Sequence, residues 1–181
     1  MPRKHTRRTA LCGVFGALAV VLMLMGGILP LATFLAPALA GLCVVPVAVE
    51  FGLKSGILVY VVVSALAGLF CPDVEAVCIY IFLLGYYPLL KVRLDRIRRR
   101  PLRMAAKLAL FNCAIAAMYT LLLVVLPVPA LQADTAGIAL PMLVTLLVMG
   151  NVTFFIYDAA LCNVFRLYLC RIRPRILHKK N

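Results

Sequence analysis

The sequence predicts an all-α integral membrane protein, a bundle of six transmembrane helices with both termini in the cytoplasm. Composition is the first observation behind this prediction. Of the 181 residues, 65% are hydrophobic and 14% are charged, whereas soluble domains are about 45–50% apolar and about 25% charged. The apolar runs are long and do not alternate with polar residues, which excludes an outer-membrane β-barrel. Helices satisfy their own backbone hydrogen bonds and therefore fit these runs.

The positions of the positive charges are the second observation. All 19 Lys and Arg residues lie in the N-terminal segment, the second or fourth connection between predicted spans, or the C-terminal tail. The first, third and fifth connections contain only acidic charges. Because cytoplasmic loops of membrane proteins are rich in Lys and Arg, a six-span topology with the basic connections inside fits the pattern. We expect a multi-pass protein of the plasma (inner) membrane.

Runs of apolar residues bounded by Gly, Pro and charged residues set the expected spans. They cover approximately residues 10–29, 31–51, 55–70, 76–90, 108–126 and 138–165. A basic cytoplasmic linker is expected over residues 91–107, and the chain 1–181 forms a single transmembrane domain. Whether residues 30–36 are helical or form a re-entrant loop is left open by the prolines around them.

The sequence has no recognisable catalytic or metal-binding pattern. Both histidines, His5 and His178, lie in the basic tails, and neither an HExxH motif nor a phosphate-binding GxxxxGK[ST] loop occurs. The 7 cysteines lack the spacing of metal ligands. We therefore expect no enzymatic activity, no metal and no cofactor. A disulfide between Cys71 and Cys78, near the outer face, stays open.

The net charge of +13 raises the question of whether the chain binds anionic lipid or nucleic acid. Because the basic residues gather on one side of the predicted membrane, they favour contact with anionic lipid at the inner face. A nucleic-acid partner is not expected.

Asp158 is the sharpest polar signal inside a predicted span. It precedes Arg166 by eight residues, or about 12 Å of helix, and a charge at mid-bilayer costs about 2.5–3.5 kcal/mol. That cost implies a partner. One interpretation is a relay or coupling contact that involves Asn112 or Asn151. The other is a buried salt bridge to a Lys or Arg at the inner face.

Glu50 is a second acidic residue at the edge of a span. It precedes Lys54 by four residues, the favourable order for an ion pair on one helix face. This pair is expected only if Gly52 does not interrupt the helix.

Polar and aromatic residues in the outer half of the predicted bundle suggest a small-molecule pocket. These residues are Thr33, Glu75, Tyr80, Tyr119 and Asn151. A few polar groups on an apolar wall are typical of such pockets. The alternative is an outer aromatic belt with acidic loops.

Small residues mark one face of the first predicted helix. Gly13 and Ala17 are four residues apart, and Gly16 lies between them. Small residues at this spacing let helices approach closely, either within the chain or against a partner.

With this topology, and with Gly13–Ala17 in place of an AxxxA pattern, the chain resembles the substrate-binding S components of energy-coupling-factor vitamin transporters. The resemblance implies a membrane-embedded subunit that binds a vitamin-like small molecule near the outer face. It also implies a membrane coupling subunit and ATPases as partners, docked on the small-residue face. The five polar residues named above are the positions onto which the family's pocket maps, and no motif indicates a particular substrate.

Two other functions are compatible with the sequence. A non-enzymatic structural subunit, such as a scaffold of cell-wall assembly, has the same hydropathy and needs helix faces but no pocket. A secondary transporter working alone is less favoured, because the chain is short and shows no paired repeats with broken helices.

Overall fold

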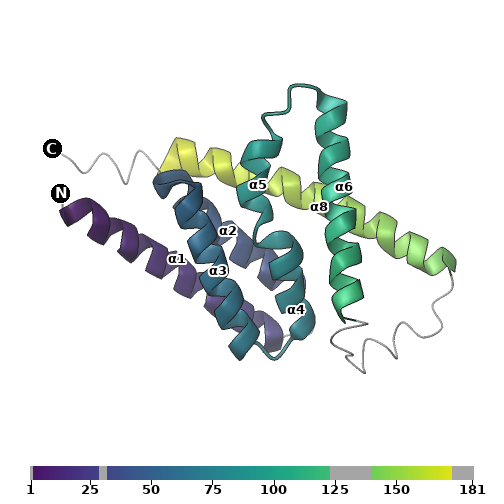
Figure 1. Cartoon of the computed structure of the whole chain (residues 1–181), viewed down its shortest axis with the longest axis horizontal. Helices are drawn as coiled ribbons and strands as arrows, with labels where there is room; N and C mark the ends of the chain where they lie inside the picture. The colour runs from purple at the N-terminus through teal and green to yellow at the C-terminus, as the bar shows by residue number, and fades with distance from the viewer. Residues whose placement is uncertain (1, 29–31, 123–139, 173–181) are drawn as a thin grey trace.

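A computed structural model of the chain describes residues 2–28, 32–122 and 140–172, and every regular element in these ranges is helical (Figure 1). The elements are α1 (Pro2–Ile28), α2 (Leu35–Phe51), α3 (Leu53–Phe70), α4 (Val74–Ile79), the π-helical segment η2 (Tyr80–Leu84), α5 (Tyr87–Leu94), α6 (Arg100–Thr120), α8 (Leu140–Leu167) and the π-helical segment η4 (Tyr168–Ile172). Five helical spans are long and apolar enough to cross a membrane, and α2 is a shorter apolar helix. The chain is thus an all-helical, multi-pass membrane protein by length and composition. The kind of membrane and the cytoplasmic location of the termini stay predictions.

The largest departure from the expected boundaries is the basic linker. Instead of spanning 91–107, the connection is reduced to residues 95–99, because α5 continues to Leu94 and α6 begins at Arg100. Lys91 and Lys107 therefore lie on helices. At the other uncertain boundary, residues 32–34 form a turn and α2 begins at Leu35. The expected helix ends at 29 and 126, and the expected start at 138, lie outside the described residues.

The short helix α2 occupies the centre of the bundle. Its residues contribute to two apolar clusters, one shared with α1 and α3 and the other with α5, α6 and α8. Because protein rather than lipid covers most of α2, it does not need the full length of a lipid-exposed span. Gly52, with φ of 83°, separates α2 from α3 in a conformation that favours glycine.

The fourth span is a broken helix. Pro88 has no N–H, so the carbonyl of Leu84 loses its helical donor. The N–H of Gly85 instead donates to the Tyr80 carbonyl at 2.8 Å, five residues back, which frees the carbonyl of Ile81. Hydroxyls from neighbouring helices fill both gaps: Tyr60 donates to Ile81 O at 2.8 Å, and Tyr157 donates to Leu84 O at 3.3 Å. The break is tolerated because these free backbone groups regain partners inside the membrane.

Glycine permits the close contact at this break. A Cβ atom added to Gly41 of α2 would lie 2.3 Å from the Leu84 carbonyl oxygen and 2.8 Å from the Tyr157 hydroxyl. Any side chain there would push α2 away from η2 and α8.

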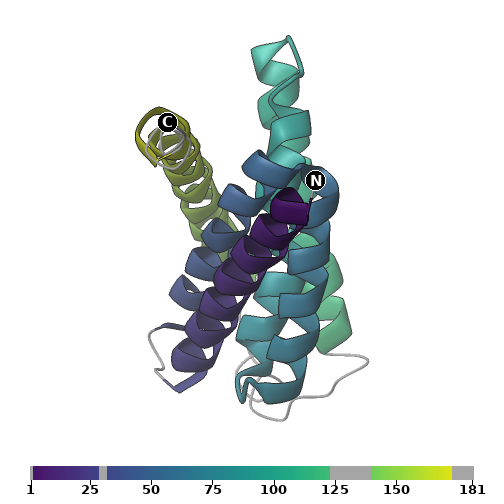
Figure 2. The ribbon, with the colours of Figure 1, turned by 90° about the vertical axis from the view of Figure 1, so that its left-hand side faces the viewer.

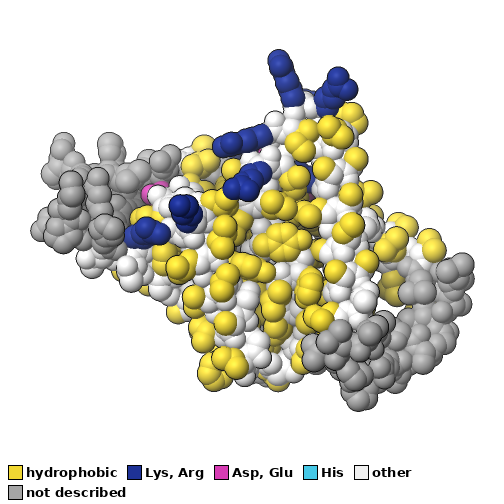
Figure 3. All heavy atoms as spheres, in the orientation of Figure 1, with side chains coloured by type: hydrophobic (Ala, Val, Ile, Leu, Met, Phe, Trp, Pro, Cys, Tyr) yellow, Lys and Arg dark blue, Asp and Glu magenta, His cyan; other side chains and the backbone are white. Residues whose placement is uncertain are grey.

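The two ends of the bundle differ in charge. The start of α1, the connection at Gly52, the connection 95–99 and the end of η4 lie toward the upper or left-hand side of the molecule (Figures 1 and 2). In Figure 3 the visible Lys and Arg side chains lie along this side, and hydrophobic side chains are spread over much of the remaining face. We call this side the basic end. It is the end that the positive-inside rule predicts to face the cytoplasm.

Candidate functional site

A buried network of charges joins three helices toward the basic end. Asp158 of α8 accepts hydrogen bonds from the ammonium groups of Lys91 on α5 and Lys107 on α6; the distance from Lys107 Nζ to Asp158 Oδ2 is 2.9 Å. The Tyr87 hydroxyl donates to Asp158 Oδ1 at 2.6 Å. Asp95 completes the network, with Oδ1 at 2.7 Å from Lys107 Nζ and Oδ2 at 3.8 Å from Lys91 Nζ.

Both lysines of this network are almost fully buried, at 2% exposure for Lys91 and 4% for Lys107. Taking an ammonium group out of water is costly unless it is paired and hydrogen-bonded. Two lysines and two aspartates give the network a formal charge of zero. The arrangement matches the salt-bridge interpretation of Asp158, and the predicted contact with Asn112 is replaced by Lys91 and Lys107.

The sequence contains one signal of this network that the predicted linker over residues 91–107 left unused. Tyr87, Lys91 and Asp95 are four residues apart, so they follow one face if the helix continues beyond residue 90. The structure places Lys91 on α5 and Lys107 on α6, both buried, and leaves the exposed Asp95 in the short connection between them. A lysine on this face, Lys91, needs an acidic partner inside the membrane, and Asp158 on another helix is that partner.

Asn112 and Asn151 form a separate amide pair between α6 and α8. Each Nδ2 donates to the other Oδ1, at 3.1 and 3.3 Å. Each also donates at 2.8 Å to the carbonyl four residues before it in its own helix. Interhelical hydrogen bonds of this kind hold membrane helices together. Asn151 is thus engaged with α6, not with the other residues of the predicted pocket.

The five predicted pocket residues are spread over different parts of the described structure. Glu75 and Tyr119 lie within range of an electrostatic interaction. Thr33 lies in the turn before α2, and Tyr80 is fully buried in the cluster shared by α1, α2 and α3. None of the five lines either of the two best-formed hollows among the described residues.

Two buried hydroxyls in the bundle form no hydrogen bond of standard geometry with a described residue. They belong to Ser64 of α3 and Tyr80 of η2. Tyr60 lies between them: its ring centroid is 5.9 Å from that of Tyr80, and its hydroxyl is close enough to Ser64, one helical turn later, for the two side chains to interact. An unsatisfied buried hydroxyl costs about 1–3 kcal/mol, so the Tyr80 hydroxyl is a polar group whose burial calls for an explanation.

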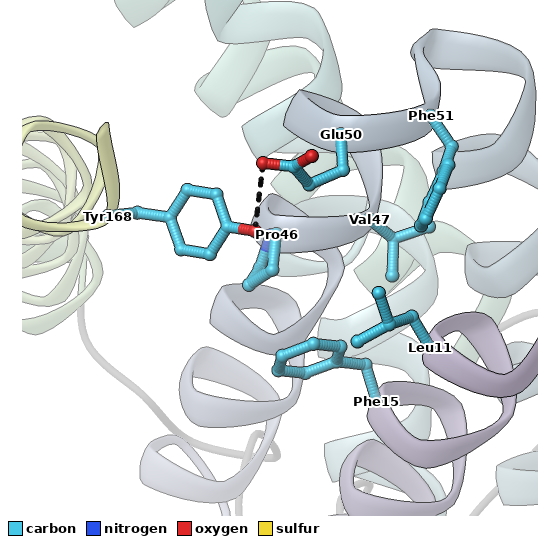
Figure 4. Close-up of a pocket in the computed structure, with 7 residues that line it drawn as sticks. All are labelled: Leu11, Phe15, Pro46, Val47, Glu50, Phe51 and Tyr168. Atoms are coloured by element: carbon cyan, nitrogen blue, oxygen red, sulfur yellow. Dashed lines mark hydrogen bonds between the residues drawn. The ribbon is translucent and has the colours of Figure 1, made fainter. Parts of the chain in front are cut away.

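Glu50 contacts η4 instead of Lys54. The Tyr168 hydroxyl donates to Glu50 Oε1 at 3.4 Å, at the edge of a shallow hollow between α1, α2 and η4 (Figure 4). Gly52 ends α2 before Lys54, so the helical spacing that the predicted ion pair requires is absent. Leu11 and Phe15 supply the α1 side of the hollow.

The predicted docking residues divide between two faces of α1. A Cβ atom on Gly13 would have no neighbour within 4 Å, and Ala17 is also exposed. Gly16 faces α3, where a Cβ atom would contact Val59 at 3.8 Å. Gly13 and Ala17 are therefore open to a partner or to lipid, and Gly16 serves packing within the chain.

The cysteines and acidic residues of the described ranges do not assemble into a metal site. The cysteines are free in the structure, so the open question of a Cys71–Cys78 disulfide resolves to two thiols; Cys71 Sγ donates to the Met23 carbonyl at 3.5 Å. Within the described ranges no group of three or more His, Cys, Asp or Glu residues could hold a metal ion.

Comparison of the chain with protein-family models, with curated proteins and with solved structures finds no match. The geometry described above is therefore the basis on which a function can be inferred.

Proposed function

We propose that the chain is the membrane-embedded substrate-binding subunit of an uptake system powered by a separate ATP-hydrolysing partner. The buried hydroxyl of Tyr80, which has no hydrogen-bond partner among the described residues, carries the proposal, together with the buried hydroxyl of Ser64 next to Tyr60. Tyr80 is 0% exposed, and it is one of the residues that the sequence predicts to line a pocket. A solute that hydrogen-bonds to these hydroxyls would recover the free energy that their isolation costs.

The depth of the two hydroxyls supports a site in the half of the bundle away from the basic end. Ser64 precedes the end of α3 by six residues, and Tyr80 follows the start of α4 by six. Each therefore lies about 9 Å along the helix from the short turn between α3 and α4. Because both hydroxyls are uncharged, the solute would be small and polar; the vitamin-like class comes from the family resemblance.

The exposed face of α1 supports a partner. Gly13 and Ala17 present an open small-residue surface, flanked by the exposed apolar side chains of Val14, Leu18 and Val21. Membrane helices pack closely on such surfaces. The proposal assigns ATP hydrolysis to the partner, since the 181 residues contain no GxxxxGK[ST] loop.

A structural membrane subunit, such as a scaffold of cell-wall assembly, is the second candidate. One observation favours it: Asn151, Tyr157 and Asp158 of α8 each form a polar contact with another helix of the bundle. In this function the bundle is a rigid platform, and its outward faces bind other membrane proteins.

Affinity purification in mild detergent, followed by mass spectrometry, separates the two candidates. We expect a membrane coupling protein and ATPases to co-purify, and Gly13→Leu with Ala17→Leu to abolish this. Gly68→Leu is the matched control, because Gly68 of α3 is also open, with nothing within 4 Å of an added Cβ. Recovery of cell-wall or division proteins without an ATPase would favour the scaffold instead.

A further inference from the structure

A hollow of about 180 Å³ lies between α3 and the end of the broken fourth span. Its lining is Leu53, Ile57 and Tyr60 from α3, and Tyr86, Leu89, Leu90 and Arg93 from the opposite side. Ile57 is 45% exposed, so the hollow opens toward the surroundings of the bundle. Its volume is below the range of about 300–1,000 Å³ for drug-sized ligands, which favours part of a longer, flexible molecule.

The hollow has one charged end and one apolar end. Leu53 and Arg93 lie at its basic end, and Tyr60 and Tyr86 lie seven residues further along α3 and back along the fourth span, about 10 Å away. The rings of Tyr60 and Tyr86 meet there with centroids 6.5 Å apart. A cationic mouth above an apolar groove is complementary to a lipid with an anionic headgroup and an acyl chain.

Charge at the mouth is available for binding. Arg93 and Lys54, the residue after Leu53, are both exposed. Neither forms an ion pair with a described acidic side chain: the salt bridges of that part of the chain involve Lys91 and Lys107. The neighbouring Lys91 is committed to Asp158, so Arg93 is the cation on α5 that can meet an external phosphate.

We propose that this hollow is a binding site for an anionic phospholipid of the leaflet at the basic end, with an acyl chain between α3 and α5 and the phosphate at Arg93. Arg93 binds the headgroup phosphate. The apolar side chains of the lining, between Leu53 at one end of the hollow and Tyr86 at the other, contact the part of the acyl chain nearest the headgroup. This inference is independent of the proposed uptake function.

Lipid binding to the purified full chain tests the site. Phosphatidylglycerol and phosphatidylcholine with identical chains are titrated separately in detergent, and bound lipid is counted by native mass spectrometry. We expect phosphatidylglycerol to bind more tightly, and Arg93→Gln to weaken it about fivefold, as expected for one surface cation. Arg96→Gln is the control, since Arg96 is a nearby exposed arginine that does not line the hollow.

A second variant, Ile57→Trp, and competition by inorganic phosphate test whether the apolar lining of the hollow contributes to lipid binding. Ile57→Trp places a large side chain at an exposed edge of the hollow, and we expect it to lower the binding of both lipids. Inorganic phosphate should not displace the bound lipid. Equal effects of Arg93→Gln and Arg96→Gln, unchanged binding in Ile57→Trp, or displacement by phosphate would overturn the proposal, because each would point to attraction by net charge alone.

Discussion

Removing the Asp158 carboxylate should destabilise the bundle strongly. Asp158→Ala leaves the ammonium groups of Lys91 and Lys107 buried with less compensation, and breaking a buried ion pair costs about 3–5 kcal/mol. Asp95 remains at 2.7 Å from Lys107 and 3.8 Å from Lys91, so part of the compensation survives. We therefore expect a loss of about 3 kcal/mol in the free energy of unfolding, or about a hundredfold in the folding equilibrium.

Equilibrium unfolding in mixed detergent micelles, followed by circular dichroism, measures this loss. Thr153→Ala is the control on the same helix, because the exposed Thr153 hydroxyl bonds only to its own backbone at Met149. The double variant Lys91→Met with Asp158→Leu should recover most of the stability, since the Lys107–Asp95 pair stays and apolar side chains replace the other charges. Two results would refute this prediction. One is a free energy of unfolding for Asp158→Ala equal to that of Thr153→Ala; the other is a further loss of that free energy when Lys91→Met is added to the Asp158 substitution.

Three further predictions concern the contacts between helices. Tyr60→Phe removes the donor to the freed Ile81 carbonyl and should cost about 1 kcal/mol in unfolding free energy; an unchanged value would contradict the account of the broken helix. A double-mutant cycle of Asn112→Ala and Asn151→Ala should give a coupling of about 0.6 kcal/mol, typical of interhelical hydrogen bonds in membranes, and zero coupling would argue against the amide pair. Gly41→Ala should lower the thermal unfolding midpoint, because its Cβ would meet the Leu84 carbonyl, whereas Gly13→Ala has open space and should not; equal midpoints would refute the close contact.

Hydropathy and charge were sufficient to predict an all-helical membrane chain, because both are properties of long stretches. The ends of the helices around residues 91–107 were not predictable in this way. Lysine is usually exposed to solvent, so residue type alone does not predict the burial of Lys91 and Lys107. Only the three-dimensional position of Asp158 shows why they are buried. The same limit applies to η2: an uninterrupted helix was expected over residues 76–90, and the hydroxyls that compensate the break come from Tyr60 and Tyr157, which are distant in sequence.

The candidate site was predicted less well than the fold. Tyr80 was predicted to line a pocket; the structure shows its side chain buried, and its role in binding stays a prediction. Asn151 was assigned to the same pocket because depth in a span can be read from sequence, whereas the direction of a side chain around its helix depends on packing. Ser64 was not among the predicted pocket residues, since nothing in the sequence shows that its hydroxyl is buried.

The most direct test of a substrate-binding subunit is to identify the small molecules that accompany the purified protein. Protein purified rapidly in mild detergent is denatured, and the released compounds are quantified by mass spectrometry for the wild type, Tyr80→Phe and Ser64→Ala. We predict one small polar compound in near-stoichiometric amount with the wild type and its loss from both variants, while the helical content is retained. Absence of any such compound, or equal amounts in all three proteins, would contradict the proposed function.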